Sequence, residues 1–256
     1  KIFTLNFILF STFFFLGFVD DKIKLSPIKK TIIILFILFI FLPLDERFVI
    51  NHLIFKDLEY SIELNQAGIF FTVASIYFFY NSVNFSDGLN GLATSSVIFW
   101  IIIFYFFGGL DKQLLLYLLI PLFLTLIFNL KNMIFLGNSG SSLLSILIST
   151  FFIFDYNNSG LLKCDQILLI MLLPCLDTVR LTIERLINKK SPFLPDNNHL
   201  HHLLLKYLSS KYILVIYLIL LSMPFILSEY FIKTYISFLI FTIFYFLLVY
   251  FLKKNR

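Results

Sequence analysis

Long apolar runs recur along the whole chain, and they limit its fold more than any other feature. A membrane-spanning helix needs about 20 mostly apolar residues, and fewer where the segment is tilted or re-entrant. Runs of this kind occupy residues 2–19, 28–44, 67–84, 91–107, 114–129, 140–154, 165–180, 212–228 and 234–252. Apolar residues make up 59% of the chain and charged residues 14%, against roughly 45–50% and about 25% in soluble domains. Because an isolated span must pair its own backbone groups in lipid, we predict an all-α, polytopic transmembrane helix bundle of about nine spans.

Lysine and arginine residues gather on one side of this predicted bundle. The basic side comprises residues 20–30, 85–90, 130–139, 181–211 and the C-terminal tail, and cytoplasmic loops carry such an excess. The net charge of +5 therefore needs no nucleic-acid partner. Residues 45–66 are too polar to span and predict an external loop or a small hairpin. We treat residues 1–256 as one membrane domain that contains a cytoplasmic loop at 181–211. Since the chain starts with Lys1 inside an apolar run, we expect its true N-terminus to be missing.

Four polar clusters lie at span ends, and the alternation of loops puts all of them on the basic side. Polar residues at such places are rare and usually functional. The clusters are Val19 to Lys22, Asn81 to Ala93, Phe135 to Ser142, and Pro174 to Leu205. The charge count did not require this convergence, which predicts one active site at the cytoplasmic membrane face.

Three carboxylates stand out in these clusters. Asp20 and Asp21 repel one another at the end of a span, and Asp87 lies in a break on the same side. A solvated helix end, with Lys22 and Lys24 as neighbours, would explain the pair alone. Together with Asp87, the pair favours a Mg²⁺ site, because Mg²⁺ binds through one or two carboxylates plus substrate phosphates.

Amides and small residues form the next two clusters. Asn81, Asn84 and Asn90 surround Asp87, and a role in helix packing explains only one or two of them. The Gly-Ser turn at 136–141 begins a span, where backbone N–H groups favour phosphate. That turn is weak evidence when taken alone.

The last cluster combines charged residues with histidines. Asp177, Arg180 and Glu184 share one helical face, and Arg185 follows them. His199, His201 and His202 could be zinc ligands, but no further cysteine or histidine lies nearby to close such a site. Imidazoles beside arginine are equally suited to diphosphate oxygens. A solvated loop helix would leave the clustering unexplained.

The motifs VDD, NxxNFSDGLNGLA, FLGNSGS and LDTxRxxxxRLxxxxSPFxPDxxHLHHLLL resemble the polyprenyl-phosphate N-acetylhexosamine-1-phosphate transferases, glycosyltransferase family 4. The loop SPFxPDxxHLHH is similar to the branch that uses undecaprenyl phosphate and UDP-GlcNAc to start O-antigen, teichoic-acid and related polymers. The resemblance implies attack of undecaprenyl phosphate on a UDP-N-acetylhexosamine, with release of UMP. It implies Mg²⁺, with Mn²⁺ as an alternative cofactor, the bacterial cytoplasmic membrane, and about two further spans before Asp20. A homodimer is left open.

The resemblance also implies roles for individual residues. It makes Asp20, Asp21 and Asp87 catalytic, and it adds Asn138 to these three as metal ligands. The predicted substrate-binding residues are Asn81, Asn84, Asn90, Asp177, Arg180, Arg185, His199, His201 and His202.

Two departures from the family pattern keep an alternative open. Asn90 and Asn138 stand where members commonly carry aspartate, so Mg²⁺ affinity should fall, and an altered homologue could bind polyprenyl phosphate or nucleotide sugar without turnover. A transporter with Asp20, Asp21 and Asp87 along its pathway is less favoured. It predicts ionisable residues near the middle of the spans, whereas these residues crowd one membrane edge.

Overall fold

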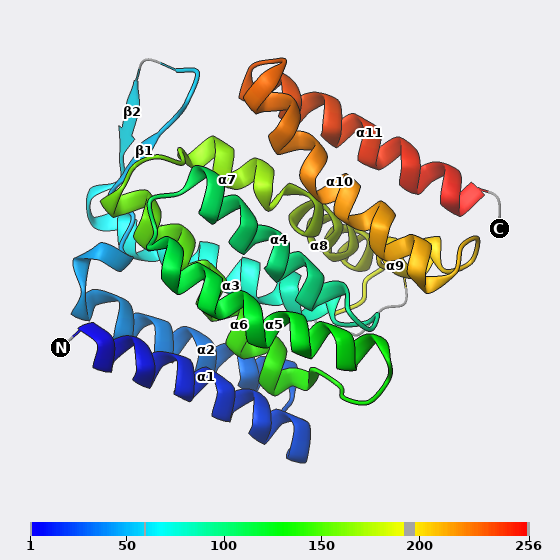
Figure 1. Ribbon diagram of the computed structural model, residues 1–256, viewed down its shortest axis with the longest axis horizontal. Coiled ribbons are helices and arrows are strands. Elements are labelled where there is room, and N and C mark those ends of the chain that lie inside the picture. Colours follow the sequence, from blue (N-terminus) through cyan, green and yellow to red (C-terminus); the bar gives the residue numbers. More distant parts are fainter. Residues whose placement is uncertain (1, 59, 192–197, 255–256) are drawn as a thin grey trace.

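The computed structural model describes residues 2–58, 60–191 and 198–254, and it is a bundle of helices with one small hairpin (Figure 1). The helices are α1 (Ile2–Ile23), α2 (Pro27–Phe41), α3 (Gly68–Ser86), α4 (Leu92–Phe107), α5 (Lys112–Leu130), α6 (Gly137–Asn158), α7 (Cys164–Ile170), α8 (Leu172–Ile187), α9 (Leu200–Leu204), α10 (Ser210–Tyr230) and α11 (Thr234–Lys254). Short 3₁₀ turns occupy Leu42–Leu44, Glu46–Phe48 and Asn65–Ala67, and the strands are β1 (His52–Ile54) and β2 (Ser61–Glu63).

All nine predicted segments are helical, which confirms the all-α bundle, but the number of spans needs correction. In the described part of the chain, five helices are long and apolar enough to cross a membrane. They are α2 with the turn that follows it, α5, α6, α10 and α11. A sixth span results if α7 and α8, which are bent by 73° at their junction, count together. Helix α4 is apolar but has only 16 residues, so it is short for a perpendicular crossing.

The polar segment between α2 and α3 forms the hairpin that was one of its two predicted structures. Strands β1 and β2 pair antiparallel, with Leu53 opposite Ile62. The Lys56 ammonium binds Glu229 at 2.7 Å, and Asp57 accepts hydrogen bonds from the backbone and hydroxyl of Thr234. These contacts fasten the hairpin to the ends of α10 and α11 opposite the polar clusters.

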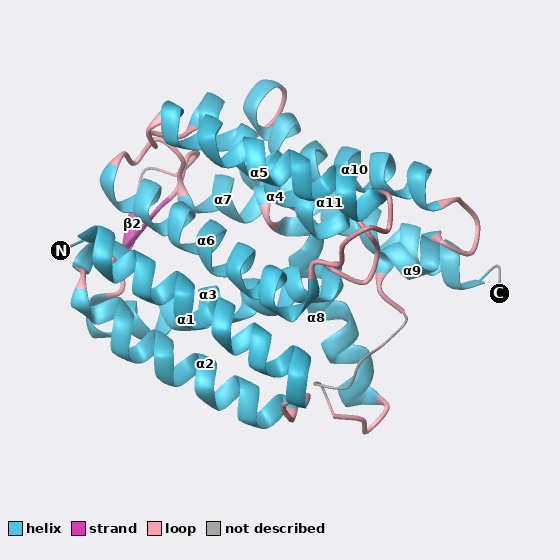
Figure 2. Ribbon diagram, turned by 60° about the horizontal axis from the view of Figure 1, so that its bottom comes forward, coloured by secondary structure: helices cyan, strands magenta, loops and turns pink. Residues whose placement is uncertain are grey.

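Close packing of α1 against α6 brings two of the polar clusters together (Figure 2). A Cβ at Gly17 would collide with the backbone of Asn138 and Ser139. Only glycine allows this approach, and it places the end of α1 directly beside the start of α6. Asp20 and Asp21 therefore reach the Gly-Ser turn.

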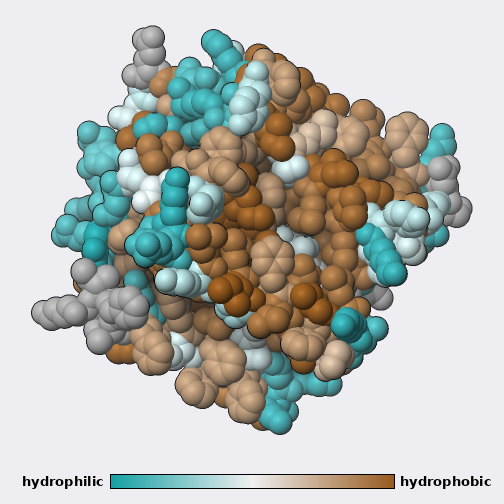
Figure 3. Space-filling model, viewed as in Figure 1, coloured by the Kyte–Doolittle hydropathy of each residue, from teal (hydrophilic) through white to brown (hydrophobic). Residues whose placement is uncertain are grey.

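The outer surface carries many apolar side chains (Figure 3). Phe36, Tyr117 and Phe251 are 66%, 68% and 58% exposed. Figure 3 shows an apolar band across the middle of one face, with hydrophilic groups at its margins. Contiguous apolar surface of this extent marks an interaction with membrane, as expected for an integral membrane protein.

Candidate active site

Asp21, near the end of α1, directs its carboxylate to the N-terminus of α6. Its carboxylate accepts hydrogen bonds from the backbone N–H of Asn138 at 2.9 Å, the Asn138 side-chain amide at 3.0 Å and the backbone N–H of Ser139 at 3.1 Å. Partial burial raises the pKa of Asp21, but these donors outweigh it and hold the pKa below its usual value. The carboxylate is thus anionic and takes the place of an anion at a helix N-terminus.

Asp20 points toward a different partner, the ammonium of Lys30. The Lys30 Nζ lies 2.8 Å from Asp20 and 3.2 Å from the amide oxygen of Asn138. The other Asp20 oxygen accepts the backbone N–H of Leu25 at 2.8 Å. Asn138 therefore bridges the two aspartates, because its N–H groups bind Asp21 and its oxygen binds Lys30. Sequence analysis missed Lys30, although a basic residue so near an Asp pair was a usable signal.

Asp87 ends α3 in the same region. Burial, and then the nearby charge of Asp21, raise the pKa of Asp87 to about 7. Asn84 joins this region to α6, since its side-chain oxygen accepts the hydroxyl of Ser141 at 2.5 Å. The predicted residue Asn81 instead donates to the Tyr77 carbonyl of its own helix.

The turn between α3 and α4 is shaped by an asparagine that sequence analysis did not single out. Gly91 has φ of 85°, a conformation that favours glycine, and its N–H donates to the buried Asn129 side chain. Asn129 also donates to the Ile134 carbonyl at 2.9 Å. The predicted residue Asn90 donates from its side-chain amide to the side-chain oxygen of Asn132, in the α5–α6 loop, at 2.6 Å.

The histidines of α9 and its N-cap approach Asp87 through its neighbour Gly88. A Cβ at Gly88 would lie 2.8 Å from Nε2 of His201 and 3.1 Å from Nε2 of His202. His199 and His201 stack with their rings 5.6 Å apart. The buried Nε2 of His201 has no hydrogen-bond partner among the described residues. Burial and the other two histidines lower the pKa of His201 to about 3, so this imidazole is neutral.

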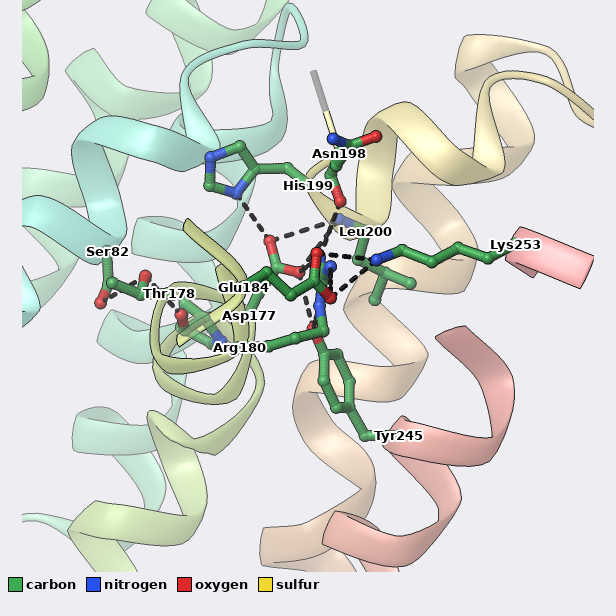
Figure 4. Close-up of polar contacts among 11 residues, drawn as sticks. Ser82, Asp177, Thr178, Arg180, Glu184, Asn198, His199, Leu200, Tyr245 and Lys253 are labelled. Carbon is green, nitrogen blue, oxygen red and sulfur yellow. Dashed lines mark hydrogen bonds and ion pairs between the residues drawn. The ribbon is translucent and has the colours of Figure 1, made fainter. Parts of the chain in front are cut away.

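Asp177 organises the far side of the histidines (Figure 4). Its buried carboxylate accepts hydrogen bonds from His199 Nδ1 at 2.8 Å, Arg180 at 2.7 Å, the Tyr245 hydroxyl at 2.6 Å and the backbone N–H of Leu200. These four donors come from α8, α11 and the start of α9. No sequence signal pointed to Tyr245, because a tyrosine within an apolar run is common in membrane helices.

Arg180 and Arg185 have different surroundings. The Arg180 guanidinium is 4% exposed and donates to Asp177, Glu184, the Tyr245 hydroxyl and the Asn198 carbonyl. It is thus directed at protein groups. Arg185 lies over the ring of Phe85 at 5.7 Å, and that ring packs on His199. The stretch 192–197 of the predicted loop lies outside the described residues.

The four predicted metal ligands do not form a preassembled cation site. In the described ranges, no group of three or more His, Cys, Asp or Glu residues is arranged to hold a metal ion. Lys30 already binds Asp20 and the oxygen of Asn138. Burial, and then the charge of Asp21, raise the pKa of Asp87, so the two carboxylates lie in the same region. Mg²⁺ binds through one or two carboxylates and takes its remaining ligands from water and substrate phosphates.

An apolar cavity of about 510 Å³ runs beside this site. It is lined by α3, α6, the bent pair α7–α8, the hairpin segment and Phe238 of α11, and the few lining residues with polar groups include Ser75 and Cys175. Leu176 and Val179, which line it, flank Asp177 on α8. The cavity therefore extends from the hairpin end of the bundle to the helix turn that bears Asp177.

Fold and site together define an integral membrane protein whose carboxylates, amides and histidines meet at one end of a helix bundle. Residues 3–155 match the model of glycosyl transferase family 4, and the chain belongs to this family, as the motifs predicted.

Several curated proteins are similar to the chain. A probable undecaprenyl-phosphate N-acetylglucosaminyl 1-phosphate transferase of Bacillus subtilis is 31% identical over 201 residues, which is 75% of this chain and 55% of that protein. The undecaprenyl-phosphate alpha-N-acetylglucosaminyl 1-phosphate transferases of Escherichia coli K12 and Salmonella typhi are 27% and 24% identical over 207 residues, with the same two coverages. The chain spans about half the length of these curated relatives.

Proposed function

We propose that the protein transfers N-acetylhexosamine-1-phosphate, in the first instance GlcNAc-1-phosphate, from a UDP-sugar to undecaprenyl phosphate. The products are UMP and a lipid-linked diphosphosugar that initiates a cell-envelope polysaccharide. The names of the similar curated proteins support this substrate class. The site would face the cytoplasm of the bacterial inner membrane, as the distribution of Lys and Arg favours.

One observation carries the proposal: carboxylates from α1 and α3, the N-terminus of α6 and the histidine pair His201–His202 meet around Gly88 and Asn138. Phosphoryl transfer demands positioning and neutralisation of charge more than covalent chemistry. The nucleophile, a phosphate monoester, is mostly dianionic at neutral pH, so it needs little help from a base.

Different residues would bind the diphosphate, neutralise charge and hold the lipid. The neutral imidazole of His201 and the adjacent His202 would donate N–H groups to diphosphate oxygens. The ammonium of Lys30 balances Asp20 and leaves Asp21 anionic. Asp87, whose pKa is raised to about 7, would give up its proton when Mg²⁺ binds. Mg²⁺, bound by Asp21 and Asp87 with the diphosphate, would neutralise charge on the transferred group. The apolar cavity beside α8 would take part of the polyprenyl chain.

The test uses the full-length gene product in detergent or bilayer with undecaprenyl phosphate, Mg²⁺ and a panel of UDP-N-acetylhexosamines. We expect metal-dependent release of UMP, and we expect Asp21→Asn to abolish it. Asp111→Asn is the matched control, since Asp111 caps α5 at the opposite end and asparagine caps equally well. Substrate binding without UMP release from any donor would refute the transferase. It would favour the non-catalytic homologue that Asn90 and Asn138 suggest.

A further inference from the structure

The hydroxyl of Tyr245 occupies an unusual place in the network around Asp177. It donates to one Asp177 oxygen at 2.6 Å and accepts from the Nε of Arg180 at 2.9 Å. Tyr245 is 1% exposed and lies on α11, 68 residues beyond Asp177. Figure 4 shows its ring rising from α11 toward the carboxylate, with His199 on the other side.

The two oxygens of Asp177 bind different partners, and this arrangement determines the orientation of the histidine rings. Tyr245 and Arg180 bind Oδ1, and His199 Nδ1 binds Oδ2. An N–H at Nδ1 leaves Nε2 of the same ring directed away from Asp177. Because His199 stacks on His201, and His201 contacts His202 with 4.2 Å between ring centroids, the orientation of one ring constrains all three.

We propose that Tyr245 is a positioning residue that orients His199, His201 and His202 through Asp177. Its donated hydrogen bond fixes the carboxylate plane and draws charge toward Oδ1, which sets the strength of the hydrogen bond that His199 Nδ1–H donates to Oδ2. A neighbouring contact on the same helix supports α8 in the same way, since Lys253 binds both oxygens of Glu184 at 2.7 Å. Helix α11 thus sets the geometry of the site although it contributes no group to the substrates. The kinetic consequence rests on the proposed function, whereas the orientation of the rings does not.

The simplest competing explanation is that Tyr245 only satisfies a buried ion pair and contributes to stability. The two roles differ in what they predict for the histidines. The chain contributes four histidines to the ¹⁵N-histidine NMR spectrum of the full-length protein, and single His→Gln variants assign the signals of these rings. If Tyr245 contributed only to stability, its replacement would change the melting temperature and leave the imidazole signals of the folded protein unchanged.

The test compares Tyr245→Phe with Tyr250→Phe, a matched change on the exposed side of the same helix. We expect Tyr245→Phe to shift or broaden the His199 Nδ1–H signal and to perturb His201 and His202. We also expect kcat/KM for the UDP-sugar to fall about tenfold, because small misplacements of binding groups are costly. In Tyr245→Phe, KM for undecaprenyl phosphate and the His52 signal should stay unchanged. In Tyr250→Phe, kcat/KM and all histidine signals should stay unchanged.

A second variant covers the case in which Tyr245→Phe does not fold. Ring-fluorinated tyrosine at position 245 keeps the hydroxyl and the shape but makes it a stronger donor. It should weaken the hydrogen bond that His199 donates to Asp177 and move the His199 Nδ1–H proton signal upfield. Fluorotyrosine at position 250 should cause neither change. Unchanged imidazole signals in folded Tyr245 variants would overturn the proposal, whatever the activity. Absence of UMP release from the wild type, with shifted signals, would refute only the proposed function.

Discussion

Gly88→Ala tests whether the histidines and the carboxylate end of α3 act as one site. The alanine Cβ would lie 2.8 Å from Nε2 of His201 and 3.1 Å from Nε2 of His202, whereas ordinary contacts begin at 3.4 Å. His201 would have to retreat by about half an ångström. It cannot do so alone, because it is 2% exposed and stacks on His199. The histidines should therefore move together away from Asp87.

The size of the effect follows from this geometry. A misplacement of about 1 Å costs about 100-fold in rate, so a shift of half that size predicts about a tenfold loss in kcat/KM. Stability should fall modestly, because overpacking a close contact typically costs about 1–3 kcal/mol. Gly88 is not in the left-handed region, and a Gly-to-Ala change at a compatible site stabilises a protein by about 0.4–1 kcal/mol through its unfolded state. This gain offsets part of the steric cost.

The assay is UMP release together with a thermal melt of the full-length protein. Gly108→Ala is the control, because Gly108 ends α4 at the far side of the bundle and the three atoms nearest to its Cβ would all belong to Phe104 of the same helix. Full activity in a folded Gly88→Ala protein would refute the close approach of the histidines to Asp87. A large loss of stability would refute the reasoning about the backbone.

Three further predictions concern charge and the cavity. The raised pKa of Asp87, about 7 against 3.8 in the unfolded chain, means that its contribution to stability is present below pH 4 and lost as pH rises through 7. Melting temperatures of the wild type should fall over this window, Asp87→Asn should flatten the curve, and added Mg²⁺ should restore stability at pH 8. Lys30→Met leaves Asp20 without its ammonium and should cost about 2 kcal/mol, seen as a lower melting temperature that exposed Lys29→Met does not share. Ser75→Trp fills the apolar cavity and should raise KM for undecaprenyl phosphate, with no effect on a short, soluble prenyl phosphate.

The sequence predicted the elements well because each is a local pattern. Every apolar run became a helix, and the polar segment 45–66 became a hairpin. The described residues contain five or six candidate spans against the nine predicted, and two of the differences are the short helix α4 and the bend between α7 and α8. Apolarity alone does not report such a bend.

For the site, the sequence predicted which segments come together, but it did not predict the residues that hold these segments in contact. The shared side of the four clusters followed from loop alternation, so Asp21, Asn138 and the histidines were expected as neighbours. The contact of Asp21 with the start of α6 depends on Gly17, which permits α1 to touch backbone. Tyr245 acts over 68 residues, and no local pattern encodes such a distance.

The carboxylates and the histidines of the site are held by different sets of helices. The carboxylate half belongs to α1, α3 and α6, within the segment that matches the family model. The histidine half belongs to α8 and α9 and is braced by α11. They meet where α3 packs on α8, through the Thr178 hydroxyl that donates to Ser82 at 3.1 Å and the ring of Phe85 against His199. Because Gly88 lies against His201 and His202 at this seam, the spacing of the two halves depends on how α3 packs on α8.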